Sequence, residues 1–180
     1  MALEFQPGYF SARLELQPIG REDAKELLAV FQDPAVRRYL LDDQLVTLDW
    51  VHDEIATSIE RFTSVGAGLW ALRLHEATEI IGFVGFRPFF EPPRLQLLYG
   101  LLPAYWGRGL ATEAAARACD HAFSHLGFDH VEAATDEPNR RSIRVLEQLG
   151  MSRDDDAGLG HPGTVFFCID RATWQQRGAP

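Results

Sequence analysis

Apolar residues change their spacing along the chain, and the spacing predicts which segments are strands and which are helices. From residue 12 to residue 17 apolar and polar positions alternate, a pattern typical of a strand with one buried face. From residue 20 to residue 62 apolar residues recur every three or four positions, as on the buried side of amphipathic helices. Turn residues divide that segment, so three helices are predicted to begin near residues 20, 34 and 48.

The alternating pattern returns at residue 69 and predicts the sheet. A hairpin with its turn at 76–78 opens this part, and its two strands and the next one are predicted to be antiparallel. The segment 152–163 is acidic and then glycine-rich, so it is predicted to hold a weak strand and an exposed loop. The predicted order is strand 69–74, strand 79–87, strand 95–101, helix 109–126, strand 131–135, helix 138–149 and strand 164–169. The fold class is therefore α/β (α+β).

Composition is consistent with one folded domain. The chain has 180 residues, 46% of them hydrophobic and 24% charged, which is typical of a globular protein with a full core. No shift in composition marks a second domain, so residues 1–180 are predicted to form one. The formal net charge of −9 argues against binding nucleic acid through a basic surface. An anionic ligand must therefore be held by local geometry.

Patterns for export, membrane insertion and metal binding are not found in the sequence. No apolar run reaches the roughly 18 residues needed to span a bilayer, and the first ten residues do not resemble a signal peptide. The expectation is a cytoplasmic protein without a membrane partner. Cys119 and Cys168 form no CxxC motif and have no histidine at ligand spacing, so neither a disulfide framework nor a metal site is predicted.

A short glycine-bearing turn lies between the strand at 95–101 and the helix that follows. Gly107 and Gly109 leave the backbone unobstructed, and the first N–H groups of the helix have no partner inside it. A phosphate can accept several of those hydrogen bonds and is stabilised by the helix dipole. A Walker loop is excluded because the chain has no Gly-Lys-Ser/Thr, and a dinucleotide-binding turn would follow the first strand. The turn is therefore predicted to bind a pyrophosphate.

Two motifs resemble those of the GNAT superfamily of acyl-CoA-dependent N-acyltransferases, most closely its ribosomal-protein-acetyltransferase branch. Residues 106–111, WGRGLA, are similar to the family's phosphate signature, (Q/R)-x-x-G-x-(G/A), except at the first position, where this branch usually has Trp. Residues 105–114 read YWGRGLATEA, which resembles the branch's YWG(K/R)GxATEA. A second motif is matched, at the expected interval, by Asn139, Ser142, Leu146 and Gly150.

This resemblance implies a GNAT fold, with a mixed, mostly antiparallel sheet of about six or seven strands and helices on both faces. The strands at 95–102 and 131–135 should splay apart as a V, with pantetheine pairing along the first of them. Acetyl-CoA is then the co-substrate, and no metal is needed. The implied cofactor contacts are Leu101, Leu102, Trp106, Gly107, Arg108, Gly109, Leu110, Ala111, Thr112, Asn139, Arg141 and Ser142. A solvated position for the arginines, Arg140 included, and a capping role for Asn139 stay open.

The resemblance also implies direct transfer, in which a neutral amine attacks the thioester. A backbone N–H near Leu101 would stabilise the oxyanion. Ser142 would protonate the leaving thiolate, because this chain has Leu146 near the position where many relatives have a tyrosine. A role for Ser142 in packing or cofactor binding alone stays open. Leu101 and Ser142 are thus the candidate catalytic residues.

The general base is left open. Several branch members have Glu on the central strand where this chain has Gln96, which cannot take a proton. Glu91, Glu54, His161 and water are the candidates. At pH 7 neutralising an α-amine of pKa about 8 costs roughly 1.4 kcal/mol, and neutralising a lysine amine of pKa about 10.4 costs roughly 4.6 kcal/mol. The missing carboxylate therefore favours an acceptor whose amine has a low pKa.

The predicted function is an acetyl-CoA-dependent N-acetyltransferase that moves an acetyl group to a primary amine by direct attack in a ternary complex. A protein or peptide N-terminal α-amine is the favoured acceptor. A small-molecule acetylase acting on polyamines, aminoglycosides or amino acids is one alternative, and a non-catalytic acyl-CoA-binding sensor is another. The expected partner is an amine-bearing small molecule or a protein N-terminus, with no direct nucleic-acid contact, for a monomer or a homodimer.

Overall fold

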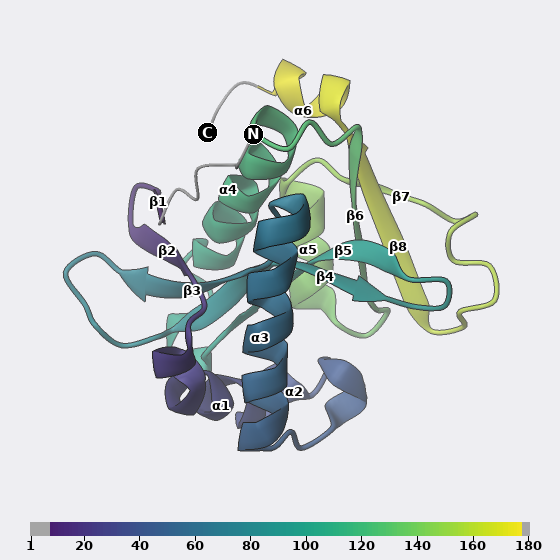
Figure 1. The fold of residues 1–180 in the computed structure, drawn as a ribbon. Helices are drawn as coiled ribbons and strands as arrows, with labels where there is room; N and C mark the ends of the chain where they lie inside the picture. Colours follow the sequence, from purple (N-terminus) through teal and green to yellow (C-terminus); the bar gives the residue numbers. More distant parts are fainter. Residues whose placement is uncertain (1–7, 178–180) are drawn as a thin grey trace.

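The computed structural model describes residues 8–177, which contain one eight-stranded sheet in the order β1-β2-β3-β4-β5-β6-β8-β7 (Figure 1). Residues 1–7, on which the expectation about a signal peptide rests in part, lie outside the described residues. Within residues 8–177 no helix is long and apolar enough to cross a membrane.

The elements follow the order that the spacing of apolar residues predicts. The strands are β1 Tyr9–Phe10, β2 Leu14–Pro18, β3 Leu69–Leu74, β4 Gly82–Phe89, β5 Arg94–Leu101, β6 His130–Asp136, β7 Ser152–Arg153 and β8 Thr164–Asp170. The α-helices are α1 Ala24–Gln32, α2 Pro34–Arg37, α3 Leu48–Val65, α4 Leu110–Ser124, α5 Arg140–Gln148 and α6 Arg171–Gln176. Short 3-10 helices are η1 Arg21–Asp23, η2 Leu41–Asp43 and η3 Pro103–Tyr105.

The sheet opens between β5 and β6. The other neighbouring strands are antiparallel, whereas β5 and β6 run parallel and are joined in the described structure at one register position, Gln96 with Glu132. β5 is paired with β4 as far as Leu101, and β6 is paired with β8 as far as Asp136. Because each strand stays with its outer neighbour, the two diverge beyond Gln96. The predicted V-shaped splay is confirmed.

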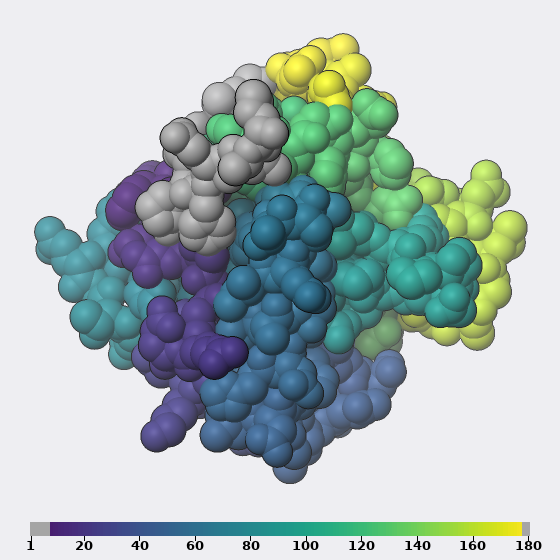
Figure 2. All heavy atoms as spheres, viewed as in Figure 1, coloured from purple at the N-terminus to yellow at the C-terminus, as the bar shows by residue number. Residues whose placement is uncertain are grey.

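Helices cover both faces of the sheet, as predicted, and each face has its own buried cluster. α4 and α5 pack on one face, where Ala114 and Ile143 are buried. α1 and α3 pack on the other face, where Leu27 and Ile55 are buried. In Figure 1 α3 crosses in front of the sheet and α5 lies behind it. Figure 2 shows α3 in blue as a ridge on the front face, with the β4–β5 hairpin to its right. The gap between β5 and β6 therefore connects two helical layers.

Four details of the prediction are wrong. β4 begins at Gly82 rather than at residue 79, because the Ile80 N–H donates to the Glu26 carboxylate at 2.8 Å and ties the preceding segment to α1. α2 ends at Arg37 rather than near residue 40, where a turn begins with Leu41 at a φ of 52°. The two-residue β1 raises the number of strands to eight, and α6 was not predicted. The predicted weak strand near residue 152 is present as β7.

Candidate active site

The end of β5 presents backbone hydrogen-bonding groups to the gap between β5 and β6. The Leu102 N–H donates to the Ile81 carbonyl at 2.9 Å, so the backbone groups of Leu102 face β4. Successive residues of an antiparallel strand direct these groups to opposite sides. The N–H and C=O of Leu101 therefore face the gap, and the carbonyl accepts from the Trp106 indole Nε1–H at 2.6 Å. The Leu101 N–H is left on the side where the predicted oxyanion donor should be.

A cavity of about 650 Å³ occupies this gap and extends to the start of α4. The ends of β5 and β6, the first turns of α4 and α5, and residues 35–40 form its walls. Among the described residues, the predicted cofactor contacts that do not line it are Leu102, whose backbone faces β4, and the exposed Arg108. Those that line it are Leu101, Trp106, Gly107, Gly109, Leu110, Ala111, Thr112, Asn139, Arg141 and Ser142. The fold thus brings both sequence motifs to one cavity.

The glycine turn, residues 107–112, leaves the start of α4 open. Gly107 and Gly109 have φ angles of 71° and 73°, a region that glycine enters without strain. α4 begins at Leu110, and no side chain caps it. A Cβ atom at position 107 would meet nothing within 4 Å, and one at position 109 would meet only the Arg13 guanidinium at 3.5 Å. The unpaired N–H groups of the first helical turn therefore have room for a pyrophosphate in front of them.

An ion pair between Arg13 and Glu113 supports the glycine turn, and sequence reasoning missed it. The Arg13 guanidinium contacts the Glu113 carboxylate at 2.6 Å and donates to the Arg108 carbonyl at 2.8 Å. The Ser11 hydroxyl also donates to Glu113, at 2.6 Å. Burial raises the pKa of Glu113, but the hydrogen bonds from Ser11 and Arg13 outweigh burial and lower it overall. Glu113 lies in the ATEA segment, residues 111–114, and this glutamate is the sequence feature that could have indicated the ion pair.

Asn139 lies at the start of α5 and caps it. Its Oδ1 accepts from the Ser142 N–H at 3.3 Å, and its Nδ2 donates to the Thr135 hydroxyl at 3.0 Å. The capping role that the sequence left open is therefore present. Because the amide also lines the cavity, a contact with pantetheine stays a prediction.

Arg141 is placed beside the cavity by an aromatic ring. Its guanidinium carbon lies 4.4 Å from the centroid of the Trp106 ring, an arrangement in which the cation is attracted to the ring face. The Thr112 hydroxyl, by contrast, donates to Gln148 at 2.8 Å. A phosphate contact therefore stays a prediction for both residues, through the backbone N–H of Thr112 and the charge of Arg141.

Ser142, the predicted proton donor, is held by a tyrosine that sequence reasoning missed. Tyr99 Oη lies 2.8 Å from Ser142 Oγ and donates to the main-chain carbonyl of Ser142 at 3.1 Å. Both side chains line the cavity. Burial raises the pKa of Tyr99 more than the bond to Ser142 lowers it, so the phenol stays protonated at neutral pH. The alternation along β5, which points Tyr99 to the same face as Leu97 and Leu101, was the available signal.

The three side chains considered as a general base do not line the cavity within residues 8–177. Glu54 is 6% exposed and is paired with Arg61 at 2.8 Å and with Arg87 at 3.0 Å, so its carboxylate is engaged by two cations. Glu91 is exposed between β4 and β5. His161 packs against aromatic rings in the loop before β8. Of the four candidates, water stays the prediction for the general base.

A sheet that splays at a parallel strand pair, with an uncapped helix start at one end of the gap, has the architecture of an acyltransferase. Comparison with protein-family models agrees, because residues 13–152 match the acetyltransferase (GNAT) domain. The chain belongs to the GNAT acetyltransferase family, which uses acetyl-CoA as its co-substrate.

Several relatives are N-acetyltransferases, and their names give more than one acceptor. The uncharacterized N-acetyltransferase p20 of Bacillus licheniformis is 27% identical over 164 residues, which cover 88% of this chain and 92% of that protein. FsC-acetyl coenzyme A-N(2)-transacetylase of Aspergillus fumigatus is 29% identical, covering 100% of this chain and 83% of that protein. Spermidine N(1)-acetyltransferase of Escherichia coli is 26% identical, covering 77% and 73%.

Solved structures share the fold. An acetyltransferase from Agrobacterium tumefaciens superposes with a TM-score of 0.79 at 24% identity, covering 94% of this chain and 98% of that chain. The ribosomal-protein-S5-alanine acetyltransferase from Vibrio fischeri superposes with a TM-score of 0.75 at 16% identity, covering 93% and 98%. Both likenesses concern the architecture alone.

Proposed function

We propose that this protein is an acetyl-CoA-dependent N-acetyltransferase that moves an acetyl group to a primary amine by direct attack in a ternary complex. The acceptor is the α-amine of a protein or peptide N-terminus. The observation that carries the proposal is the cavity between β5 and β6, which joins the uncapped start of α4 to the gap-facing side of Leu101. An elongated thioester carrying a pyrophosphate suits these two ends.

Residues at different positions along the cavity would have different roles in binding and catalysis. The N–H groups of residues 109–112 would donate to the pyrophosphate, and Arg141 would add positive charge beside them. The gap-facing backbone groups of β5 would pair with pantetheine as with an added strand. The Leu101 N–H would donate to the thioester carbonyl oxygen as negative charge develops there. Ser142 would give its hydroxyl proton to the departing sulfur.

The choice of acceptor depends on whether a carboxylate is free to act as the general base. Glu54 is engaged by two arginines, and among the described residues no carboxylate lines the cavity. The amine must therefore lose its proton to water. At pH 7 an α-amine of pKa about 8 is roughly one part in ten neutral, and a lysine amine of pKa about 10.4 is roughly one part in 2,500 neutral. Water is an adequate base for the first amine only.

A release assay tests the enzymatic part of the proposal. The protein is incubated with acetyl-CoA and a panel of amines, and the free thiol of CoA is measured as it appears. We expect amine-dependent release that depends on protein concentration. Tight CoA binding without release by any amine would instead support a non-catalytic sensor.

The same panel tests the acceptor. It contains peptides with a free N-terminus, the same peptides acetylated at the N-terminus but carrying a lysine, spermidine, an aminoglycoside and single amino acids. We expect the highest kcat/KM for a free peptide N-terminus, with the acetyl group located on the α-nitrogen by mass spectrometry. A higher kcat/KM for spermidine or another small amine would overturn the proposed acceptor and leave the transferase activity standing.

A further inference from the structure

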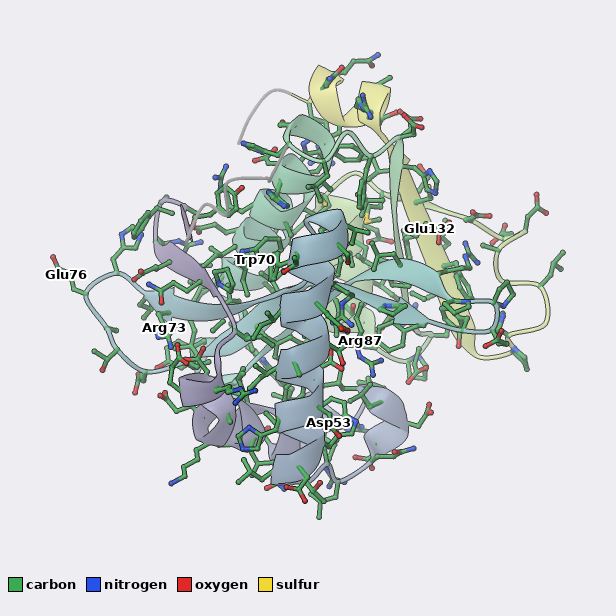
Figure 3. All side chains as sticks on the ribbon, viewed as in Figure 1. Asp53, Trp70, Arg73, Glu76, Arg87 and Glu132 are labelled. Atoms are coloured by element: carbon green, nitrogen blue, oxygen red, sulfur yellow. The ribbon has the colours of Figure 1, made fainter. Side chains whose placement is uncertain are left out.

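Four arginines line the cavity, and within residues 8–177 none of them is paired with a carboxylate. They are Arg38, Arg140, Arg141 and Arg144. Outside the cavity, Arg73 contacts Asp23 at 2.6 Å. Arg87 contacts Glu54 at 3.0 Å, and Figure 3 labels both of these paired arginines. Because the chain has a formal net charge of −9, unpaired cations gathered along one cavity indicate an anionic ligand.

Two of the four arginines are set apart by their surroundings. Arg141 is held over the Trp106 ring, beside the proposed pyrophosphate site. Arg38 follows α2 and belongs to a different wall of the cavity. The other two, Arg140 and Arg144, are exposed residues of α5, and among the described residues their side chains make no hydrogen bond, ion pair or ring contact. Arg140 and Arg144 therefore have no partner in the described protein that accounts for their place on the cavity wall.

The helix places Arg140 and Arg144 next to one another and close to the start of α4. Residues four apart lie on one side of a helix, with about 5–6 Å between their Cβ atoms, and like charges at this spacing repel each other. Glu147, three residues after Arg144, forms no ion pair with it in the described chain. Gln148, one turn further along the same side, accepts from the Thr112 hydroxyl of α4 at 2.8 Å. Arg144 thus lies about 6 Å along the axis from a residue that touches the proposed pyrophosphate site.

CoA carries a phosphate that the glycine turn does not account for. Its pyrophosphate is assigned to the N–H groups of residues 109–112 and to Arg141, but a further phosphate lies on the 3′-oxygen of the ribose, one sugar ring away. This group is a phosphomonoester, with a charge of about −1.5 to −2 at pH 7. A guanidinium donates two parallel N–H bonds to such a group. Two neighbouring arginines therefore suit it in both charge and geometry.

We propose that Arg140 and Arg144 bind the 3′-phosphate of CoA. The phosphate takes the place of the missing carboxylate, and the repulsion between the two arginines is offset by their attraction to a shared anion. The site selects CoA thioesters over donors that have the pantetheine and the pyrophosphate but lack the 3′-phosphate. The inference rests on the acetyl-CoA-dependent function proposed above, and it adds to that function two residues that select the acyl donor.

Comparison of CoA with dephospho-CoA, which lacks only the 3′-phosphate, tests the proposal by calorimetry without an acceptor. For the unchanged protein we expect the Kd for dephospho-CoA to be roughly tenfold higher than that for CoA, as for two partly exposed charge pairs. Because both ligands carry the pyrophosphate, contacts at the glycine turn are the same for the two. The ratio of the two Kd values therefore reports on the 3′-phosphate alone.

Substitution of the arginines assigns the contact to them. Glutamine removes the charge and is nearly as good a helix former as arginine, so α5 should stay intact. For Arg144→Gln, and likewise for Arg140→Gln, we expect the Kd for CoA to rise roughly threefold while the Kd for dephospho-CoA is unchanged. The double variant should bind the two ligands equally. Arg21→Gln is the matched control, because Arg21 is exposed, does not line the cavity of the described protein and carries the same charge. It should keep the ratio of the unchanged protein.

Three outcomes would overturn the proposal. The first is equal affinity of the unchanged protein for CoA and dephospho-CoA, and the second is a preference for CoA that survives in the double variant. The third is an equal rise of both Kd values in the double variant, which would assign the arginines to the pyrophosphate. Each of these leaves the transferase function standing, because the release assay tests that function separately. A protein that selects CoA through these arginines but acetylates no amine would overturn the transferase function and support the 3′-phosphate site.

Discussion

The indole Nε1–H of Trp106 donates to the carbonyl oxygen of Leu101 across 2.6 Å. This bond ties the glycine turn to the end of β5 and uses the Leu101 carbonyl while the N–H of the same residue faces the gap. The same ring lies beneath the guanidinium of Arg141. Trp106 therefore links the proposed pyrophosphate and thioester ends of the cavity, which gives a physical reason for a tryptophan at the first position of the phosphate signature.

Removing the indole donor should weaken acetyl-CoA binding. Trp106→Phe keeps an aromatic face for Arg141 but frees the Leu101 carbonyl, so the end of β5 loses a bond that holds it against the turn. We expect the Kd for CoA, measured by calorimetry, to rise about fivefold, corresponding to roughly 1 kcal/mol for one hydrogen bond. Trp174→Phe is the control, because its indole donates to Asp120 at 2.9 Å from α6. Equal CoA affinity in the two variants would contradict a specific role for Trp106.

A side chain at Gly109 should block the start of α4. Valine there must adopt a φ of 73°, and its Cβ would lie 3.5 Å from the Arg13 guanidinium, within the turn where the pyrophosphate is proposed to bind. We expect the Kd for CoA to rise more than about tenfold, because several N–H donors are obstructed together. Gly160→Val is the matched control: its φ is 86° and its Cβ would meet nothing within 4 Å. Both variants should lose about 1–2 kcal/mol of stability from the left-handed backbone, so only CoA affinity should separate them.

Local chemistry explains what could be predicted from the sequence. Glycines 107 and 109, between an apolar run and a helical pattern, predict an anion-binding turn without any knowledge of the rest of the chain. The spacing of apolar residues predicts the order of the elements in the same way, because it too is a local property of the sequence. The two-residue β1 and the six-residue α6 are too short to establish a period, so their absence from the prediction follows from their length.

The side-chain pairs that shape the site are distant in sequence, and periodicity carries no information about them. Arg13 and Glu113 are 100 residues apart, and Tyr99 and Ser142 are 43 apart. Glu54, a candidate base from the sequence, is buried and is paired with Arg87 of β4, 33 residues away. Only the folded sheet brings these partners together.

The pairing of Glu113 predicts how stability depends on pH. The pKa of Glu113 is lowered in the folded protein, so its carboxylate stabilises the fold above the unfolded value of about 4.3 and this contribution is lost as the pH falls through the folded pKa. We expect the Tm of the unchanged protein to fall more steeply below about pH 4.3 than that of Glu113→Gln.

Glu60→Gln is the control for that measurement, because Glu60 is an exposed residue of α3. It should keep the pH dependence of the unchanged protein. If Glu113→Gln also keeps it, then the ion pair with Arg13 adds nothing to stability.

Tyr99 should control catalysis through Ser142. Tyr99→Phe keeps the partly buried ring but removes the contact with Ser142 Oγ at 2.8 Å, leaving the serine hydroxyl free to rotate. We expect kcat to fall roughly tenfold, as for one hydrogen bond that orients a reacting group, while the KM for acetyl-CoA changes by less than about twofold. Ser142→Ala should lower kcat at least as much, and the double variant should lose no more than Ser142→Ala alone, because the tyrosine acts through the serine.

Tyr9→Phe is the control, since it removes a 2.7 Å bond to His121 from a tyrosine that does not line the cavity of the described protein. Steady-state kinetics with both substrates varied separate these outcomes. A normal kcat in Ser142→Ala would show that the serine is not the proton donor. A normal kcat in Tyr99→Phe alone would show that the serine needs no partner.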